Sequence, residues 1–309
     1  MRVVFLGSGA FAIPSFEALL AAGHDVVALV TQPDREKGRG REVAPPPLKP
    51  VAERSRIPVF QPRRIKDTAA QDALRALVPD AQVVVAYGQI LPLPVIEIPR
   101  LGTVNVHASI LPRYRGAAPI QWAIANGETE TGVTTILIDE GLDTGPTLLT
   151  VATPIAADER AAELEPRLAR LGAALLLDTL HGLEVGSLVP FPQDNARASH
   201  APLIRKEDGQ IDWTWPAATI ANRVRGFHPW PGAVTAFQGR PLKVLRAKAA
   251  ENGTGEPGTV LAADRDGILV ACGEDTRLRL IDVQPESRKA MTAAAFAAGA
   301  RLGPGARLG

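Results

Sequence analysis

Three polar residues of this 309-residue chain have the types and spacing that carbonyl chemistry needs. Asn105 and His107 stand two positions apart in the segment TVNVH, so both project from one face of a predicted strand. Asp143 lies in the turn GLDTG, whose glycines allow the backbone to hold a carboxylate at a strand edge. An amide donor, an imidazole and a carboxylate can together polarise a carbonyl, stabilise an oxyanion and accept a proton. The trio needs no metal and no covalent nucleophile, so it indicates direct acyl transfer or hydrolysis.

The elements that must position this trio alternate between apolar strands and amphipathic helices. Strands are predicted at 2–7, 25–31, 57–61, 82–88 and 103–107, and helices at 14–23 and from 67 to about 78. This alternation predicts a mostly parallel sheet with helices on both faces. Ligands of such sheets bind at the carboxyl ends of the strands, where Asn105 and His107 lie. Without the turn that carries Asp143, the two would be interpreted as buried polar side chains bonded to the backbone.

The second half of the chain has a different pattern. An antiparallel pair is predicted at 131–140 and 146–155, and a long helix from about 160 to 183 closes a first domain, residues 1–186. Residues 187–204 are rich in Pro, Asp, Asn and Ser and are a predicted linker. Residues 205–309 carry a short helix and five short strands separated by glycine turns, which predicts a small β-barrel.

Composition narrows the class of protein. Hydrophobic residues make up 46% of the chain and the formal net charge is +1, which argues against disorder. No apolar run approaches the roughly 18–20 residues that cross a bilayer. A single cysteine excludes an internal disulfide and a Cys-cluster zinc site, so we expect a cytoplasmic, metal-independent protein. Residues 203–309 carry 15 basic and 11 acidic residues, which indicates either an anionic partner or ordinary scatter of surface charge.

The opening Gly7–Ala12 offers an alternative from another enzyme class. It fits the dinucleotide pattern G-x-G-x-x-A after a first strand, and Asp34 supplies an acidic residue at a plausible distance. A nicotinamide-dependent dehydrogenase is therefore a competing hypothesis. Pro14 counts against it, because it places the helix start too late for the helix N-terminus to meet a pyrophosphate.

The segment Arg35–Pro50 is a basic, glycine-containing loop that runs into prolines. Most charge runs are solvated connections, but this one is long for a strand-to-helix link, and long loops in compact domains are often functional. Arg39 stands between two glycines, so its backbone could approach a phosphate closely.

Five segments together resemble the methionyl-tRNA formyltransferase family over nearly the whole chain. They are FLGSGAFAIP, TQPDREKGRGR, NVHASILPRYRGAAPIQWAI, TGVTTILIDEGLDTG and LIRKEDGQIDWTWPAATIANRVRGFHPWPGA. The resemblance gives the glycines at residues 7 and 9 an explanation other than a dinucleotide. Departures from the family pattern are small and spare the trio: Ala108, Pro146, Gly226 and His228.

The resemblance implies a Rossmann-like α/β formyltransferase domain followed by an OB-like β-barrel that binds tRNA. It implies formyl transfer from 10-formyltetrahydrofolate to the α-amine of methionyl-initiator tRNA, through a tetrahedral intermediate. Nothing in the sequence demands a partner subunit, so we expect a monomer. The implied catalytic residues are Asn105, His107 and Asp143. The implied folate-binding residues are Tyr87, Gly88, Ser109, Ile110, Leu111, Pro112, Asp139, Gly141 and Leu142. The implied tRNA-binding residues are Arg35, Lys37, Arg39 and Arg41.

Other proteins that use a related pocket remain alternatives. A sugar-nucleotide N-formyltransferase is the strongest, because the same trio could formylate an aminosugar. Glycinamide ribonucleotide formyltransferases lack an appended basic barrel. A non-catalytic RNA-binding module would leave the trio unexplained. The basic Arg35–Glu42 loop and the basic C-terminal part favour the tRNA enzyme.

Overall fold

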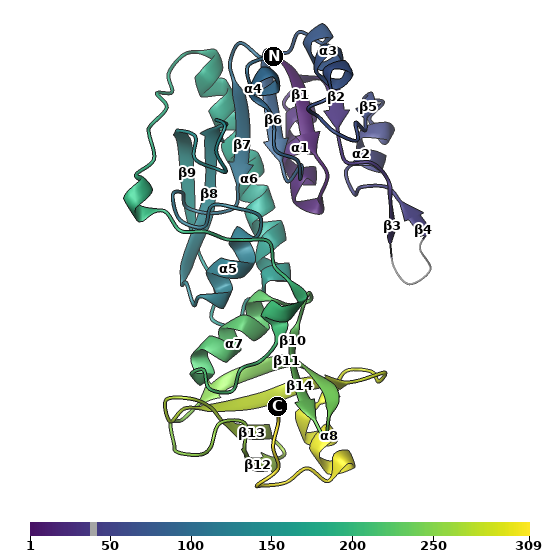
Figure 1. Ribbon diagram of the computed structural model, residues 1–309. Helices are drawn as coiled ribbons and strands as arrows, with labels where there is room; N and C mark the ends of the chain where they lie inside the picture. The colour runs from purple at the N-terminus through teal and green to yellow at the C-terminus, as the bar shows by residue number, and fades with distance from the viewer. Residues whose placement is uncertain (38–41) are drawn as a thin grey trace. The chain divides into compact units, whose positions relative to one another are not determined.

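The computed structural model describes residues 1–37 and 42–309, and this part of the chain divides into two compact units (Figure 1). Unit 1 consists of Met1–Gly116, Thr131–Thr153 and Glu165–His200. Unit 2 consists of Ala117–Glu130, Pro154–Leu164 and Ala201–Gly309.

Unit 1 is built on a seven-stranded sheet with the order β5-β2-β1-β6-β7-β8-β9. The strands are β1 (Arg2–Gly7), β2 (Asp25–Val30), β5 (Val59–Phe60), β6 (Ala81–Val85), β7 (Thr103–His107), β8 (Glu130–Leu137) and β9 (Thr147–Pro154). The pairs β5–β2, β2–β1, β1–β6 and β6–β7 are parallel, and β7–β8 is antiparallel, so the predicted mostly parallel sheet is confirmed. Strand order reverses at β1, which places the binding crevice of such folds at the carboxyl ends of β1 and β6.

Helices cover both faces of this sheet. Phe5 of β1 packs edge-on against Phe16 of α1 (Ile13–Ala21), with ring centroids 5.3 Å apart. The flanking β1 residues Val4 and Leu6 point to the opposite face. There they share a core cluster with Leu74 of α3 (Thr68–Ala76) and Val95 of α4 (Leu93–Ile96). Burying each such side chain contributes about 1.5–3 kcal/mol to stability. The remaining short helix is α2 (Lys49–Arg54).

The long helix α6 (Ala161–Glu184) fixes which face of β7 stays polar. A Cβ on Gly172 of α6 would lie 2.8 Å from Val106, so this helix lies directly against the Val106 face. The helix also bonds to β8, since Thr179 Oγ1 and Thr135 Oγ1 are 2.8 Å apart. Because side chains alternate along a strand, Asn105 and His107 are left on the other face.

Unit 2 contains an antiparallel sheet with the order β10-β11-β14-β13-β12, to which β15 adds beside β14. Its strands are β10 (Ala233–Phe237), β11 (Arg240–Ala250), β12 (Val260–Asp264), β13 (Gly267–Ala271), β14 (Arg277–Pro285) and β15 (Met291–Thr292). Its helices are α5 (Pro119–Ala125), α7 (Ala217–Gly226) and α8 (Ala293–Ala300).

The C-terminal tail joins the two edge strands of this sheet. Leu308 bridges antiparallel to Phe237 of β10, and Arg307 bridges antiparallel to Thr259, the residue before β12. The backbone bonds of Leu308 N to Gly258 O and Gly309 N to Ala236 O support both bridges. The tail therefore completes a closed cycle of strands, and the predicted barrel is confirmed.

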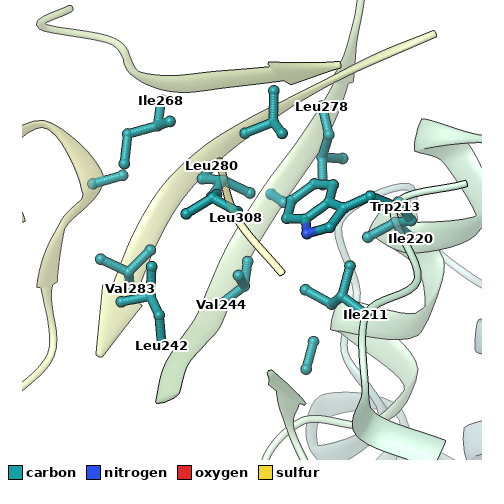
Figure 2. Close-up of a cluster of buried hydrophobic side chains, with 14 of the residues drawn as sticks. Ile211, Trp213, Ile220, Leu242, Val244, Ile268, Leu278, Leu280, Val283 and Leu308 are labelled. Carbon is teal, nitrogen blue, oxygen red and sulfur yellow. The ribbon is translucent and has the colours of Figure 1, made fainter. Parts of the chain in front are cut away.

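The barrel interior is filled by apolar side chains, with Leu308 of the tail among them (Figure 2). Trp213 is 6% exposed and buries its one polar atom with a partner, because Nε1 donates to Thr235 Oγ1 at 3.0 Å. By pairing with part of each edge strand, the tail also reduces the unpaired edge that an open sheet would expose.

Residues 187–200, here called the strap, run along unit 1 after α6. Phe191 in the strap and Thr147 in β9 exchange backbone hydrogen bonds, with both N···O distances at 2.8 Å. Farther along, Ser199 Oγ accepts from Tyr114 N and Ser199 O accepts from Arg115 N. The predicted linker thus includes a segment that is bonded to the loop after β7.

Candidate active site

The strand β7 presents Asn105 and His107 in the middle of the sheet. It lies between β6 and β8, where Asn105 is opposite Ile136 and His107 is opposite Thr134. His107 is 6% exposed and ends the strand, and Asn105 is half-buried. Their position at a carboxyl end is the one that the sequence predicts.

The loop between β8 and β9 carries Asp143. Asp139 ties this loop to itself, since Oδ1 accepts from Gly141 N at 3.0 Å and from Thr144 Oγ1 at 2.6 Å. A Cβ on Gly145 would lie 1.8 Å from Leu137 O, so only glycine fits there. Leu137 N donates to Pro146 O at 3.0 Å, so Pro146 continues the pairing of β8 with β9. Asp143 itself has φ +54°, in the left-handed region.

The structure brings the three predicted catalytic residues together. Asn105 Nδ2 donates to Asp143 Oδ1 at 3.1 Å, and His107 Nδ1 lies 3.5 Å from Asp143 Oδ2. Gly116 N also donates to Asp143 Oδ2, at 2.9 Å. The Asp143 side chain is 13% exposed, so its partners act in a partly desolvated setting where charge interactions are stronger than in water.

The tautomer of His107 follows from its second contact. His107 Nε2 lies 2.9 Å from Tyr114 O, and a carbonyl oxygen can only accept, so Nε2 carries a proton. The other ring nitrogen, Nδ1, is the atom that faces Asp143 Oδ2.

The loop after β7 contains four of the predicted folate residues. Ser109 Oγ donates to Arg113 O at 2.6 Å and Ser109 O accepts from Thr134 Oγ1 at 2.7 Å, so Ser109 fastens the loop. Leu111 N donates to Thr134 Oγ1 at 3.1 Å. Ser109 and Leu111 are buried, and Ile110 and Pro112 are half-buried.

Tyr87 and Gly88 lie after β6, beside the switch point of the sheet. The Tyr87 carbonyl accepts from Ser8 Oγ and Gln32 Nε2, and Ser8 Oγ also accepts from Gln32 N and Thr31 Oγ1. Ser8 therefore joins the ends of three strands. The Tyr87 side chain is 2% exposed in the core, and burial raises the pKa of its phenol. Tyr87 could meet a ligand only through its backbone, whereas Gly88 is exposed.

Gly141 and Leu142 are also exposed, in the loop that carries Asp143. Leu142 exposes 60% of its surface next to this carboxylate. An exposed apolar side chain beside polar groups is typical of a site that binds a ligand with both an aromatic ring and polar groups. A cavity of about 440 Å³ elsewhere in unit 1, between β5 and α3, includes none of the predicted folate residues.

The predicted tRNA loop is in part a hairpin. β3 (Arg35–Lys37) pairs antiparallel with β4 (Glu42–Ala44). Arg35 is exposed and donates from Nη2 to Gln32 Oε1 at 2.9 Å. Arg39 and Arg41 lie outside the described residues. At the hairpin base, Asp34 binds both Lys49 Nζ and Gln61 Nε2, and the Lys49 bond is the larger reason that the pKa of Asp34 is lowered.

The structure adds residues that sequence reasoning did not single out: the backbone groups of Tyr114 and Gly116, the hydroxyl of Ser8, and Gln193. Tyr114, Gly116 and Ser8 lie inside motifs quoted above, so the sequence identified their segments but not the individual residues. Gln193 Nε2 donates to Asp143 O and Gly145 O, at 2.9 and 2.7 Å. Nothing in its sequence context distinguishes it from other linker residues.

The fingerprint at Gly7–Ala12 does not open a helix. A 3-10 turn at Ala10–Ala12 separates the glycines from α1, which begins at Ile13. A Cβ on Gly7 would lie 2.9 Å from Val85 O, so Gly7 serves the close approach of β1 and β6. Among the described residues, no group of three His, Cys, Asp or Glu side chains is arranged to hold a metal ion.

Comparison with known proteins agrees with this geometry. The formyl transferase family matches residues 1–180, and its C-terminal domain matches residues 203–301. A methionyl-tRNA formyltransferase of Trichlorobacter lovleyi is 52% identical over 307 residues, which cover 99% of this chain and 96% of that protein. The chain belongs to the methionyl-tRNA formyltransferase family.

A second member of this family and a solved protein of the same fold are also similar to this chain over most of its length. The methionyl-tRNA formyltransferase of Solibacter usitatus is 52% identical over 312 residues, covering 100% of this chain and 99% of that one. A solved N-formyltransferase from Helicobacter canadensis, in complex with folinic acid and dTDP-3-aminofucose, shares the fold with a TM-score of 0.68. It is 18% identical and covers 92% of this chain and 98% of its own. Membership of the family makes this chain a formyltransferase.

Proposed function

We propose that this chain transfers a formyl group from 10-formyltetrahydrofolate to the α-amino group of methionine esterified to initiator tRNA. The observation that carries the proposal is the Asn105–Asp143–His107 cluster at the end of β7, in a chain about half identical to methionyl-tRNA formyltransferases along its length. The sugar N-formyltransferase is a distant relative by comparison, at 18% identity.

The bound folate would supply an activated formyl carbonyl. Asn105 has a second N–H on Nδ2, beyond the one that Asp143 accepts, and this N–H would donate to the formyl oxygen. His107 would donate from Nδ1, because Nε2 is bound to Tyr114 O. Each donor that meets developing negative charge contributes roughly 3–4 kcal/mol to lowering the barrier.

Asp143 would act on both donors and on the attacking amine. It accepts from the Asn105 amide through Oδ1, and its Oδ2 faces His107 Nδ1 at 3.5 Å. As the C–N bond forms, the amine loses a proton, which Asp143 would accept directly or through one water. The bond between the formyl carbon and the folate nitrogen then breaks, and that nitrogen regains a proton.

The division of the chain gives each part a task. We assign catalysis to residues 1–186 and tRNA binding to residues 205–309, joined by residues 187–204. Residues 203–309 carry four more basic than acidic residues, and the sequence adds Arg35, Lys37, Arg39 and Arg41 as a basic segment. Phosphate contacts of this kind make tRNA affinity fall steeply with salt. Both substrates are cytoplasmic, so we expect the chain to act in the cytoplasm, as a monomer. Among its described residues, no helix is long and apolar enough to cross a membrane.

The proposal is tested by offering charged initiator tRNA and a UDP-aminosugar in parallel, with 10-formyltetrahydrofolate as donor and His107→Ala as the control. Formylated methionyl-tRNA that the variant fails to make would support donor, acceptor and site together. Transfer to the sugar alone would keep the folate chemistry and overturn the assignment of tRNA. Replacing Arg39 should raise the KM for tRNA more than the KM for folate, and the opposite ranking would assign this basic segment to the donor.

A further inference from the structure

We propose that Gln193 is a positioning residue, which holds the loop that carries Asp143 at the distance from Asn105 and His107 that formyl transfer requires. This inference rests on the proposed function, because Gln193 acts only through Asp143. Gln193 is half-buried and lies in the strap, 50 residues after Asp143 in the sequence.

The Gln193 amide bonds to the backbone on both sides of Thr144. Its Nε2 donates to Asp143 O at 2.9 Å and to Gly145 O at 2.7 Å, which uses both of its N–H groups. Asp143 is in the left-handed region at φ +54°, a conformation that non-glycine residues rarely adopt. Such a conformation persists where neighbouring contacts determine it, and the Gln193 bonds supply them.

The other end of the amide reaches the loop after β7. Gln193 Oε1 accepts from Arg115 Nε at 3.1 Å and from Arg115 Nη2 at 2.8 Å. A guanidinium only donates and a carbonyl only accepts, so the amide has one orientation that satisfies all four bonds. Gln193 is thus a cross-link between two loops that are far apart in the sequence.

Those two loops meet again at the carboxylate itself. Gly116, the residue after Arg115, donates its backbone N–H to Asp143 Oδ2 at 2.9 Å. Gln193 therefore fixes Asp143 by its carbonyl and, through Arg115, fixes the N–H group that orients its carboxylate. A loop shift of about 1 Å at such a site can cost on the order of 100-fold in rate.

Arg115 makes a sharp test possible. It is 5% exposed, and among the described residues its guanidinium bonds to the amide oxygens of Gln193 and Asn195 and to no carboxylate. Gln193→Glu would give this buried cation an ionised partner of the same shape, which maintains stability. The same substitution replaces the Nε2 donor by an oxygen that faces two carbonyl oxygens, which repels the Asp143 loop. A stable but slow enzyme is the expected signature.

The experiment measures kcat, both KM values and the thermal midpoint for wild type, Gln193→Glu, Gln193→Met, Asp143→Asn and the double variant Gln193→Glu/Asp143→Asn. We expect Gln193→Glu to lower kcat about 10- to 100-fold, with KM values changed less than about threefold and an unchanged midpoint. Gln193→Met keeps the shape and removes the donors, so its kcat should also fall. The double variant should be no slower than Asp143→Asn, because Gln193 acts only through Asp143 and has no further effect once the Asp143 carboxylate is removed. Asp194→Asn is the matched control, since Asp194 is exposed and accepts from Ala196 N within the strap.

The possible outcomes separate the two hypotheses. An inactive wild type would overturn the proposed function, and Asp143→Asn with normal kcat would overturn the role of Asp143 and this inference with it. A wild-type kcat in both Gln193 variants, beside a slow Asp143→Asn, would overturn the inference alone. So would losses that multiply in the double variant, or a kcat loss that only accompanies a lowered midpoint.

Discussion

Asn105 Nδ2 lies 3.1 Å from Asp143 Oδ1, so one hydrogen bond joins the middle of the sheet to a loop 38 residues farther along the chain. This bond uses one amide N–H and aims the other. It also places the carboxylate where Oδ2 meets both Gly116 N and the imidazole of His107. Under the proposed function, formyl transfer should therefore depend on how well the Asp143 loop is held, and the predictions below probe its parts.

Asn105→Ala should lower kcat about 100- to 1,000-fold, since it removes one donor to the developing charge and frees the Asp143 carboxylate. Folding should be little affected, because Asn105 is half-buried. Steady-state rates and unfolding midpoints check this together. Asn252→Ala, on an exposed residue, is the control and should match wild type in both. A kcat above a tenth of the wild-type value would remove Asn105 from the mechanism.

His107 should carry a proton on Nε2, because Tyr114 O can only accept. Long-range ¹H–¹⁵N correlation spectra of protein labelled on its five histidines report which ring nitrogens are protonated. The His107→Ala variant identifies the signal by its loss. A bare Nε2 beside a protonated Nδ1 would contradict this assignment.

Gly145→Ala should destabilise the protein by more than about 2 kcal/mol or displace the Asp143 loop, because its Cβ would lie 1.8 Å from Leu137 O. Activity should fall in either case. Gly303→Ala is the matched control, since a Cβ there meets nothing within 4 Å. Denaturant unfolding and formyl transfer measure the two effects. A fully active, equally stable Gly145→Ala would mean that the loop tolerates movement.

Leu308→Ala should destabilise unit 2 by about 2–4 kcal/mol, because Leu308 is 3% exposed and lies in the barrel core that its tail closes. Leu203→Ala, at a residue with 72% of its surface exposed, should change stability by less than about 0.5 kcal/mol. Calorimetric unfolding of both variants compares them directly. Equal midpoints would show that the tail does not contribute to the barrel.

Asp80→Asn should destabilise the protein by about 1 kcal/mol at neutral pH. The pKa of Asp80 is lowered first by the backbone N–H of Arg2 and then by Arg100, so its ionised form is the one that stabilises the fold. That contribution is complete above the ordinary carboxyl pKa of about 4 and is lost as pH falls through the lowered folded value.

The difference in unfolding free energy between wild type and Asp80→Asn should therefore stay constant down to about pH 5 and vanish in acid. Asp72→Asn, which breaks the exposed pair with Arg75, should cost less than about 0.5 kcal/mol. A difference that grows toward low pH would contradict the sign of the Asp80 effect.

The sequence by itself determined the class of fold and which residue types are proposed for the site. Strand and helix periods are local, so the alternation along residues 1–107 was enough to predict a parallel sheet with helices on both faces. Residues two apart on a strand share a face, which placed Asn105 beside His107. The glycines around Asp143 predicted a tight loop, and the structure shows Gly145 packed against Leu137 O.

The tertiary structure alone decided how the site is held. No local pattern relates Gln193 to Asp143 or Leu308 to Phe237, because both contacts depend on where long-range packing brings distant segments. The tautomer of His107 likewise depends on a carbonyl that turns back toward the ring only after the Ser109–Arg113 turn has formed. The residue types can be read from the sequence. The distance between two loops depends on all the hydrogen bonds that join them, and no repeating sequence pattern predicts those bonds.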